Sequence, residues 1–526
     1  MRIPVLVLGA TLAAAPLAAQ LTTPERTGHR ETSSHADVLR FLDSLQRRGA
    51  DLRIWTLATG VEGRPVPVVL AARPMVDGPA AAHRSGKPIV YLQGNIHAGE
   101  VEGKEAVQML LRDLTLGPLR PLLDSVILLA VPIYNADGNE HWGPAERNRP
   151  GQNGPAVLGE RGNGQGLDLN RDYVKLEAPE TRGALALLDA WDPDLFIDLH
   201  TTNGSYHGYA LTFSPGLNPN SPAANDYVRD RFLPAVRRRM RERHRWETFW
   251  YGNFRNQEPD SLVQGWETYD PRPRFGTNWV GMRGRLAILS EAYSNDPFER
   301  RIRVTYDFVR EILGLAAEER QAIRAAVAAS DRWRPDSVTV RSAYAAPTVQ
   351  DVVAELTRPA GDGAGPFARR ERTGVFRAIR MPVYDRFAPA RRERIPAAYL
   401  LPPRLAHVAA LLRRHGVVVH RLGGRWSGPA ERFAVDSLVV LPLFEGHRTV
   451  QVEGRWRPAE VEAGPGWFYV PTDQRLGVFA AYLLEPASED GVVTWNLLDR
   501  ELRKGGLHPI ARVAAPLAVE MRLVDD

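Results

Sequence analysis

The sequence predicts an α/β fold made of a larger N-terminal domain and a smaller C-terminal α/β domain. The chain has 526 residues, enough for two or three domains that each bury a core. Its first half alternates strand-like and helix-like segments, and several strand-like segments are near-continuous runs of Ile, Val and Leu, as expected for strands covered on both faces. A stretch rich in Pro, Gly and charge then separates this half from a second set of elements.

The strands of the first half are predicted from short aliphatic runs bounded by turn-forming or charged residues. In chain order they cover residues 51–56, 65–71, 88–93, 125–133, 194–199, 210–213 and 285–289. Apolar residues at helical spacing predict the helices between them, as from Val107 to Leu114, and Pro179 stands at the favoured first position of another. The predicted helices cover residues 35–46, 100–114, 179–190, 223–243 with a break at Pro234, and 296–313.

The N-terminal residues 1–20 are typical of a secretory signal peptide. Arg2 precedes an apolar stretch that begins at Ile3, and small residues follow at Ala18 and Ala19. The stretch is short for a bilayer span and Pro16 interrupts it, which disfavours an uncleaved anchor, and no other segment is apolar enough to cross a membrane. We therefore expect an exported protein, either periplasmic or secreted.

The remainder is expected to comprise a catalytic domain at 21–330, a linker and connecting segment at 331–395, and a C-terminal domain at 396–526. In the last of these, helices are predicted at 405–414 and 475–484 and strands at 416–422 and 436–442. The segment Phe444-Glu-Gly-His447 resembles a metal motif, but a polar loop after the strand is the favoured interpretation. No chemical role follows for this domain.

Charge and cysteine content restrict the function. The formal net charge of +5 is small for this length, and the basic run Arg237–Arg245 is best explained as a solvated helix face, so no nucleic-acid partner is expected. The sequence indicates no partner protein. Because the chain has no cysteine, a metal site is limited to His, Asp and Glu.

Three polar residues at predicted strand ends suggest a metal site. His97 and Glu100 follow the strand at 88–93, where Gly94 and Gly99 allow sharp turns, and His200 follows the strand at 194–199. Open α/β sheets bind ligands at the carboxyl ends of their strands. Two imidazoles and one carboxylate form a ligand set of catalytic zinc, although such ligands also accept cobalt, nickel or manganese in vitro.

Further residues fit a hydrolytic site around this metal. Glu291 follows the strand at 285–289 and is the candidate general base, with a capping or ion-paired glutamate as the alternative. Asn170 and Arg171 together offer an amide and a guanidinium that suit a carboxylate.

The order of these elements resembles the zinc metallocarboxypeptidase family of the carboxypeptidase A and B type. The resemblance spans residues 22–315 and rests on five ordered elements: His97-Ala-Gly-Glu100, Asn135-Ala-Asp-Gly138, Asp168-Leu-Asn-Arg171, His200 and Glu291. It implies a three-layer α/β/α domain with a mixed sheet and a peptidase that holds one Zn²⁺ per chain. The proline of the family's Asn-Pro-Asp-Gly element is Ala136 here.

The resemblance also implies a role for each matching residue. His97, Glu100 and His200 bind zinc, and Glu291 takes a proton from the attacking water and passes it to the departing amine. Asn170 and Arg171 bind the terminal carboxylate of a peptide, and Asp168 orients a ligand imidazole. For the arginine that stabilises the oxyanion, spacing favours Arg149 over Arg161 and Arg147. Tyr269 corresponds to the mobile tyrosine of the family or is a packing residue.

Two other enzymatic functions remain open, and a third, non-enzymatic function is disfavoured. A zinc deacylase of the aspartoacylase type shares several of these elements, including an Asp-Leu-His-x-Thr element at 198–202, but the export signal favours a peptidase. A cell-wall peptide hydrolase fits the same compartment. A binding protein without activity is disfavoured, because such a protein has no need of Glu291 beside a metal.

Overall fold

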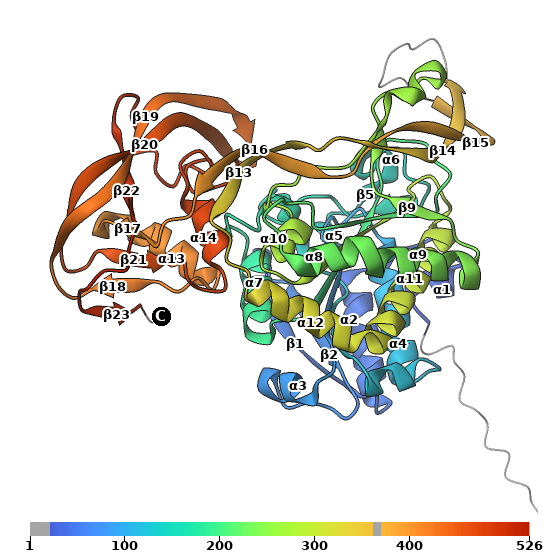
Figure 1. The fold of residues 1–526 in the computed structure, drawn as a ribbon. Helices are drawn as coiled ribbons and strands as arrows, with labels where there is room; N and C mark the ends of the chain where they lie inside the picture. The colour runs from blue at the N-terminus through green and yellow to red at the C-terminus, as the bar shows by residue number, and fades with distance from the viewer. Residues whose placement is uncertain (1–20, 361–369, 525–526) are drawn as a thin grey trace, which may run out of the picture.

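The computed structural model describes residues 21–360 and 370–524, which form two domains connected by long strands (Figure 1). The predicted signal peptide at 1–20 lies outside the described residues. Within the described part of the chain, no helix combines the length and apolarity that a membrane span needs.

An eight-stranded mixed sheet forms the centre of the N-terminal domain. Its spatial order is β1-β2-β4-β3-β7-β12-β8-β9, and β4, β3, β7 and β12 run parallel to one another. Strand β2 pairs antiparallel with both β1 and β4, and β8 pairs antiparallel with β12, while β9 pairs in parallel with β8. The strand bounds are β1 Leu52–Thr59, β2 Pro65–Ala71, β3 Ile89–Gly94, β4 Ile127–Val131, β7 Leu195–Thr201, β8 Leu211–Pro215, β9 Thr248–Trp250 and β12 Leu286–Ala292.

Helices cover both faces of this sheet, because successive residues of the buried strands point to opposite sides. Tyr91 and Phe196 lie in one hydrophobic cluster together with residues of α7 and α10. Leu92 and Ile197 lie in the other, with residues of α2, α4 and α11. The three-layer α/β/α prediction is therefore confirmed. The helix bounds are α2 His35–Arg47, α4 Glu102–Thr115, α7 Pro179–Trp191, α8 Ala223–Tyr227, α9 Leu233–His244, α10 Gly276–Met282, α11 Phe298–Glu318 and α12 Arg320–Asp331.

The C-terminal domain consists of a seven-stranded antiparallel sheet with two helices, in agreement with the predicted smaller α/β domain. The strand order is β20-β19-β22-β17-β21-β18-β23. The element bounds are β17 Ala398–Leu401, α13 Ala406–Arg414, β18 His420–Leu422, β19 Trp426–Phe444, β20 His447–Ala463, β21 Phe468–Pro471, α14 Gly477–Leu484, β22 Leu507–Val513 and β23 Met521–Leu523.

The segment at 331–395 corrects the sequence prediction, because its described residues are largely β-structure rather than a linker. β13 Ser337–Tyr344 pairs with β16 Phe387–Arg394, and β14 Thr348–Pro359 pairs with β15 Arg370–Tyr384. The prediction gave too much weight to the Pro and Gly run at 359–366, most of which lies outside the described residues, and too little to the valine and alanine residues before it. Strands β14 and β15 run across the N-terminal domain (Figure 1), where β15 pairs with β11 Trp266–Glu267.

The two domains share a continuous core. Trp279 of α10 packs edge-on against Phe479 of α14, with ring centroids 6.3 Å apart, and its indole Nε1 donates to His415 Nδ1 at 3.3 Å. Arg283 Nη1 donates to the His415 carbonyl at 2.6 Å. All four side chains are buried. The C-terminal domain is thus fixed against the helical layer on one face of the catalytic sheet.

Candidate metal centre

The site lies at the carboxyl ends of the three central parallel strands β3, β7 and β12. Strand β3 ends at Gly94, and the loop that follows carries His97 and Glu100 before α4 begins at Glu102. His200 lies near the end of β7, and Glu291 pairs in register with it on β12. Because neighbouring parallel strands end at the same edge, these segments converge even though they are far apart in the sequence.

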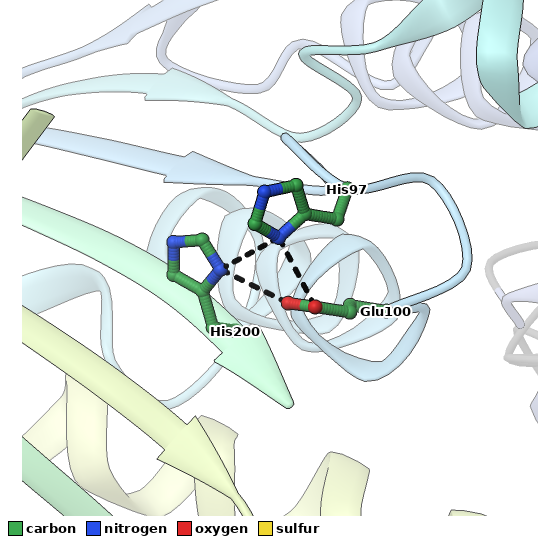
Figure 2. Close-up of side chains that lie close together, drawn as sticks. All are labelled: His97, Glu100 and His200. Atoms are coloured by element: carbon green, nitrogen blue, oxygen red, sulfur yellow. Dashed lines mark hydrogen bonds and ion pairs between the residues drawn. The ribbon is translucent and has the colours of Figure 1, made fainter. Parts of the chain in front are cut away.

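His97, Glu100 and His200 direct their ligand atoms to one point (Figure 2). Glu100 Oε1 lies 3.0 Å from His97 Nδ1, and Glu100 Oε2 lies 2.9 Å from His200 Nδ1. The two Nδ1 atoms are 3.2 Å apart. The candidate ligand atoms, one from each residue, all lie within 4.8 Å of one another, and all three side chains are buried. Two imidazole nitrogens and a carboxylate, brought together away from water, suit a zinc ion.

Each imidazole is held on its far side by an aspartate. His97 Nε2 lies 2.9 Å from Asp168 Oδ1, and His200 Nε2 lies 2.9 Å from Asp198 Oδ2. A carboxylate at Nε2 fixes the ring orientation and leaves Nδ1 free to bind a metal. Asp168 thus lies within hydrogen-bond distance of His97, and its orienting role stays a prediction. Sequence reasoning gave Asp198 no role, although it stands two residues before His200 on a strand and so shares its face.

Two of the three candidate arginines contact Glu100, one of the candidate metal ligands. Arg149 Nη1 lies 3.1 Å from Glu100 Oε1, and Arg161 Nη1 lies 3.4 Å from the same oxygen. Arg161 also binds Asp168 Oδ2 through Nη2 at 2.8 Å. Arg147 instead makes exposed hydrogen bonds to Asn148 and Trp142.

Nearby charges shift the pKa values of Glu100 and His200 in opposite directions. Burial alone disfavours the charge of Glu100, but Arg149 and His97 outweigh it and hold the pKa well below the usual value. Burial likewise lowers the pKa of His200, but Asp198 and Glu100 raise it well above the ordinary value. Glu100 is therefore held as a carboxylate, the form that binds a cation, whereas a metal ion would have to displace the proton that the neighbouring carboxylates favour on His200.

Glu291 lines a cavity of about 240 Å³ beside the three ligands. Burial raises the pKa of its carboxyl to about 8, and only 8% of the residue is exposed. A buried carboxyl with a raised pKa, next to a metal site, has the properties of a general base.

The other side of this cavity contains the predicted carboxylate-binding residues. Asn170 Oδ1 accepts a hydrogen bond from the Gly276 amide at 2.9 Å, which fixes the direction of the Asn170 amide group. The Arg171 guanidinium lies 4.0 Å from the centre of the Phe275 ring. Tyr269 also lines the cavity, and its hydroxyl donates to Asn278 Oδ1 at 3.3 Å.

Sequence reasoning missed part of this cavity. Tyr251, Asp270, Phe275 and Leu289 also line it. They lie on loops or inside a strand without a recognisable motif, so no signal in the sequence identified them, except that Asp270 directly follows Tyr269. Tyr251 stacks edge-on with Tyr269, with ring centroids 5.7 Å apart.

A second cavity of about 530 Å³ meets the first at the metal centre. Both are lined by His97, Glu100 and Arg161, and the larger one extends past Arg149 toward Tyr206. The centre is therefore open to space on two sides.

Residues 38–248 match the family model described as zinc carboxypeptidase. Carboxypeptidase 2 of Trichophyton rubrum is 22% identical over 473 residues, which cover 86% of this chain and 81% of that protein. Carboxypeptidase 2 of Trichophyton tonsurans is 24% identical over 481 residues, with the same two shares. Human carboxypeptidase Z is 32% identical over 164 residues, which cover 29% of this chain and 24% of that protein.

Among solved structures, a metallo-carboxypeptidase from Burkholderia cenocepacia aligns with a TM-score of 0.40 at 19% identity, covering 55% of this chain and 70% of that one. A metallo-carboxypeptidase from Pseudomonas aeruginosa aligns with a TM-score of 0.39 at 19% identity, covering 54% of this chain and 69% of that one.

Proposed function

We propose that the chain, whose residues 38–248 match the zinc carboxypeptidase family model, is an exported enzyme that removes residues from the C-terminal end of peptides. The observation that carries the proposal is the convergence of His97, Glu100 and His200 beside Glu291. These three residues would hold one zinc ion per chain, since within residues 21–360 and 370–524 no second group of this kind occurs.

Zinc held there would polarise the scissile carbonyl and make a water molecule more acidic. The chain supplies the remaining groups. Glu291 takes a proton from the attacking water and returns it to the leaving amine. Arg149, with Arg161 next to it, donates hydrogen bonds to the oxygen on which negative charge develops. Both guanidiniums already lie beside Glu100.

Asn170 and Arg171 hold the terminal carboxylate of the substrate. They lie in the smaller cavity together with Glu291, so a peptide anchored there presents its last amide bond to the base. A guanidinium and an amide together provide enough donors for both oxygens of a carboxylate. Tyr269 forms part of the wall around the terminal residue.

The two cavities favour a peptide over a small N-acyl amino acid. The smaller one, of about 240 Å³, accommodates a single residue, and the larger one, of about 530 Å³, accommodates the chain that precedes it. A deacylase of the aspartoacylase type has no need of the second space. A cell-wall peptide would use both cavities, so it remains a second candidate substrate within the same proposal.

The test is a mixed library of free peptides, N-acyl amino acids and cell-wall peptides, incubated with the purified protein with and without a chelator. We expect stepwise loss of C-terminal residues, read by mass, that the chelator abolishes and added zinc restores. Internal cuts or release of free acyl groups would overturn the exopeptidase. Export is tested separately by cell fractionation and by the N-terminal sequence of the mature protein, which we expect to begin after residue 20.

A further inference from the structure

The turn between β19 and β20 brings the C-terminal domain to the catalytic site. Phe444 pairs with His447, so Glu445 and Gly446 form a two-residue hairpin turn. Both have positive φ, 49° at Glu445 and 77° at Gly446. Such turns favour Asn-Gly or Asp-Gly, because positive φ is costly for most other residues. A glutamate in this place points to a role for its side chain.

The side chain of Glu445 holds the backbone of the catalytic domain. Its Oε2 accepts a hydrogen bond from the main-chain N–H of Asp168 at 3.1 Å. Two neighbouring contacts keep the turn in place. Lys175 Nζ donates to the Glu445 carbonyl at 3.4 Å, and His447 Nε2 lies 2.7 Å from Glu177 Oε1.

The segment that Glu445 holds contains several of the proposed active-site residues. Asp168 Oδ1 accepts from the Asn170 N–H at 2.9 Å and so begins the short 3₁₀ turn Leu169–Arg171, and the same oxygen lies 2.9 Å from His97 Nε2. One carboxylate from the C-terminal domain therefore fixes the start of a turn that presents Asn170 and Arg171. The Glu445 charge also attracts the Arg171 guanidinium.

Contacts of Arg274 hold the turn end of the hairpin against the catalytic domain. Arg274 of the catalytic domain is buried and lies against the rings of Phe444 and Trp495, 5.1 and 4.6 Å from their centroids. Its Nη2 forms an ion pair with Asp490 at 2.7 Å. These contacts set the position of the hairpin independently of Glu445.

We propose that Glu445 is a positioning residue that the C-terminal domain contributes to the active site, where it holds the Asp168–Arg171 turn in the geometry that binds a terminal carboxylate. This gives the C-terminal domain a function, and it rests on the proposed carboxypeptidase activity. The role concerns substrate binding more than bond cleavage, so its loss raises KM while kcat changes little.

Glu445→Asn is the decisive variant, because asparagine suits a positive φ but is too short to reach Asp168. Glu445→Gln keeps an acceptor oxygen and removes only the charge. Asp436→Asn is the matched control: Asp436 is a half-exposed carboxylate on the same hairpin that pairs with Arg455 at 3.6 Å, away from the site. All variants are made in the full chain and compared for melting temperature, hydrogen exchange of residues 168–171, and kinetics on a free peptide.

We expect Glu445→Asn to keep or raise the melting temperature, to speed amide exchange at 168–171, and to raise KM roughly ten-fold, the effect of losing one hydrogen bond to a charged group. Glu445→Gln should recover most of both properties, and Asp436→Asn should match the unaltered protein. Wild-type exchange and KM in Glu445→Asn would overturn the inference. If the unaltered protein removes no C-terminal residue, the proposed function fails, while the exchange measurement still decides whether Glu445 holds the turn.

Discussion

Glu291 and His200 occupy the same register position on the adjacent parallel strands β12 and β7. Two buried strands thus place the proposed base and a proposed metal ligand side by side. Because neither residue lies on a flexible loop, their spacing is set by the core of the sheet.

Replacing Glu291 by glutamine should abolish turnover without releasing the metal. The amide keeps the shape of the side chain but cannot take a proton, so we expect kcat to fall by about 10²–10⁴-fold, the usual range for a general base. Metal content, measured by atomic emission, should stay near one ion per chain. In the control His97→Ala, both metal and activity should be lost. Full activity in Glu291→Gln would remove this residue from the mechanism.

The aspartates behind the two imidazoles should control metal affinity. Asp198→Asn removes the charge that orients His200, and we expect zinc to bind about 10–100-fold more weakly. The affinity can be measured by competition with a coloured chelator. Asp43→Asn, at an exposed position on α2, serves as the control and should bind zinc as the unaltered protein does. Equal affinities for Asp198→Asn and this control would contradict the proposed role.

Much of the fold and the metal ligands followed from local patterns in the sequence. The strands at 65–71 and 88–93 and the helix at 35–46 were predictable because aliphatic runs and helical spacing match their burial. His97 and Glu100 were recognisable because they lie in the loop that follows such a strand, and His200 because it lies at the end of one. The structure brings the three together as predicted.

Contacts between distant segments were not predictable. The β14–β15 pair was mistaken for a linker, since its partner β11 is too short to stand out in the sequence. The segment Phe444-Glu-Gly-His447 was interpreted as a polar loop, whereas Phe444 and His447 are strand residues and only Glu445 and Gly446 form the turn. The packing of the C-terminal domain through Trp279 and Phe479, together with the contacts of Arg274, brings its glutamate to Asp168.

Arg149 should contribute to catalysis where its near neighbour Arg147 does not. Arg149 lies beside Glu100, while Arg147 binds only neighbouring residues at the surface, so the pair forms a matched comparison. We expect Arg149→Gln to lower kcat by about 10²–10³-fold, as for other lost oxyanion donors, and Arg147→Gln to leave it unchanged. Steady-state kinetics on one peptide measures both. If Arg161→Gln instead shows the larger loss in kcat, the oxyanion role passes to Arg161.

Arg171 should discriminate between free and blocked peptide ends. Arg171→Ala removes the guanidinium and with it the ion pair to a terminal carboxylate. A terminal amide carries no charge, so a substrate with an amidated end has no such ion pair to lose. We expect kcat/KM to fall about ten-fold or more on free peptides and to change little on the amidated forms, whose basal cleavage is slow. Arg182→Ala, on α7 outside the two cavities, is the control. An equal loss on both substrates would exclude recognition of the terminal carboxylate.

Three histidines away from the metal centre should make the fold sensitive to acid. His207, His415 and His508 are completely buried, and burial lowers the pKa of each to about 3. In the unfolded chain a histidine has a pKa of about 6.5. Between these values the unfolded chain binds more protons, so the stabilisation is present above about pH 6.5 and is lost progressively as pH falls toward 3.

His508→Asn isolates one of these contributions. His508 Nδ1 accepts a hydrogen bond from the Ile510 N–H at 3.3 Å, and the asparagine oxygen can replace that acceptor without binding a proton. At pH 5 each neutral buried histidine should cost about 2 kcal/mol of stability relative to pH 7. Carboxyls with raised pKa, such as Asp172 at about 6 because of burial, act in the opposite direction, so the total change is not diagnostic. The diagnostic quantity is the difference between variant and parent in the loss of unfolding free energy.

Urea unfolding at pH 7 and pH 5 should therefore show a loss about 2 kcal/mol smaller in His508→Asn than in the unaltered protein. His83→Asn, at an exposed position, should match the parent. Identical losses in all three proteins would mean that His508 is protonated in the folded state at pH 5.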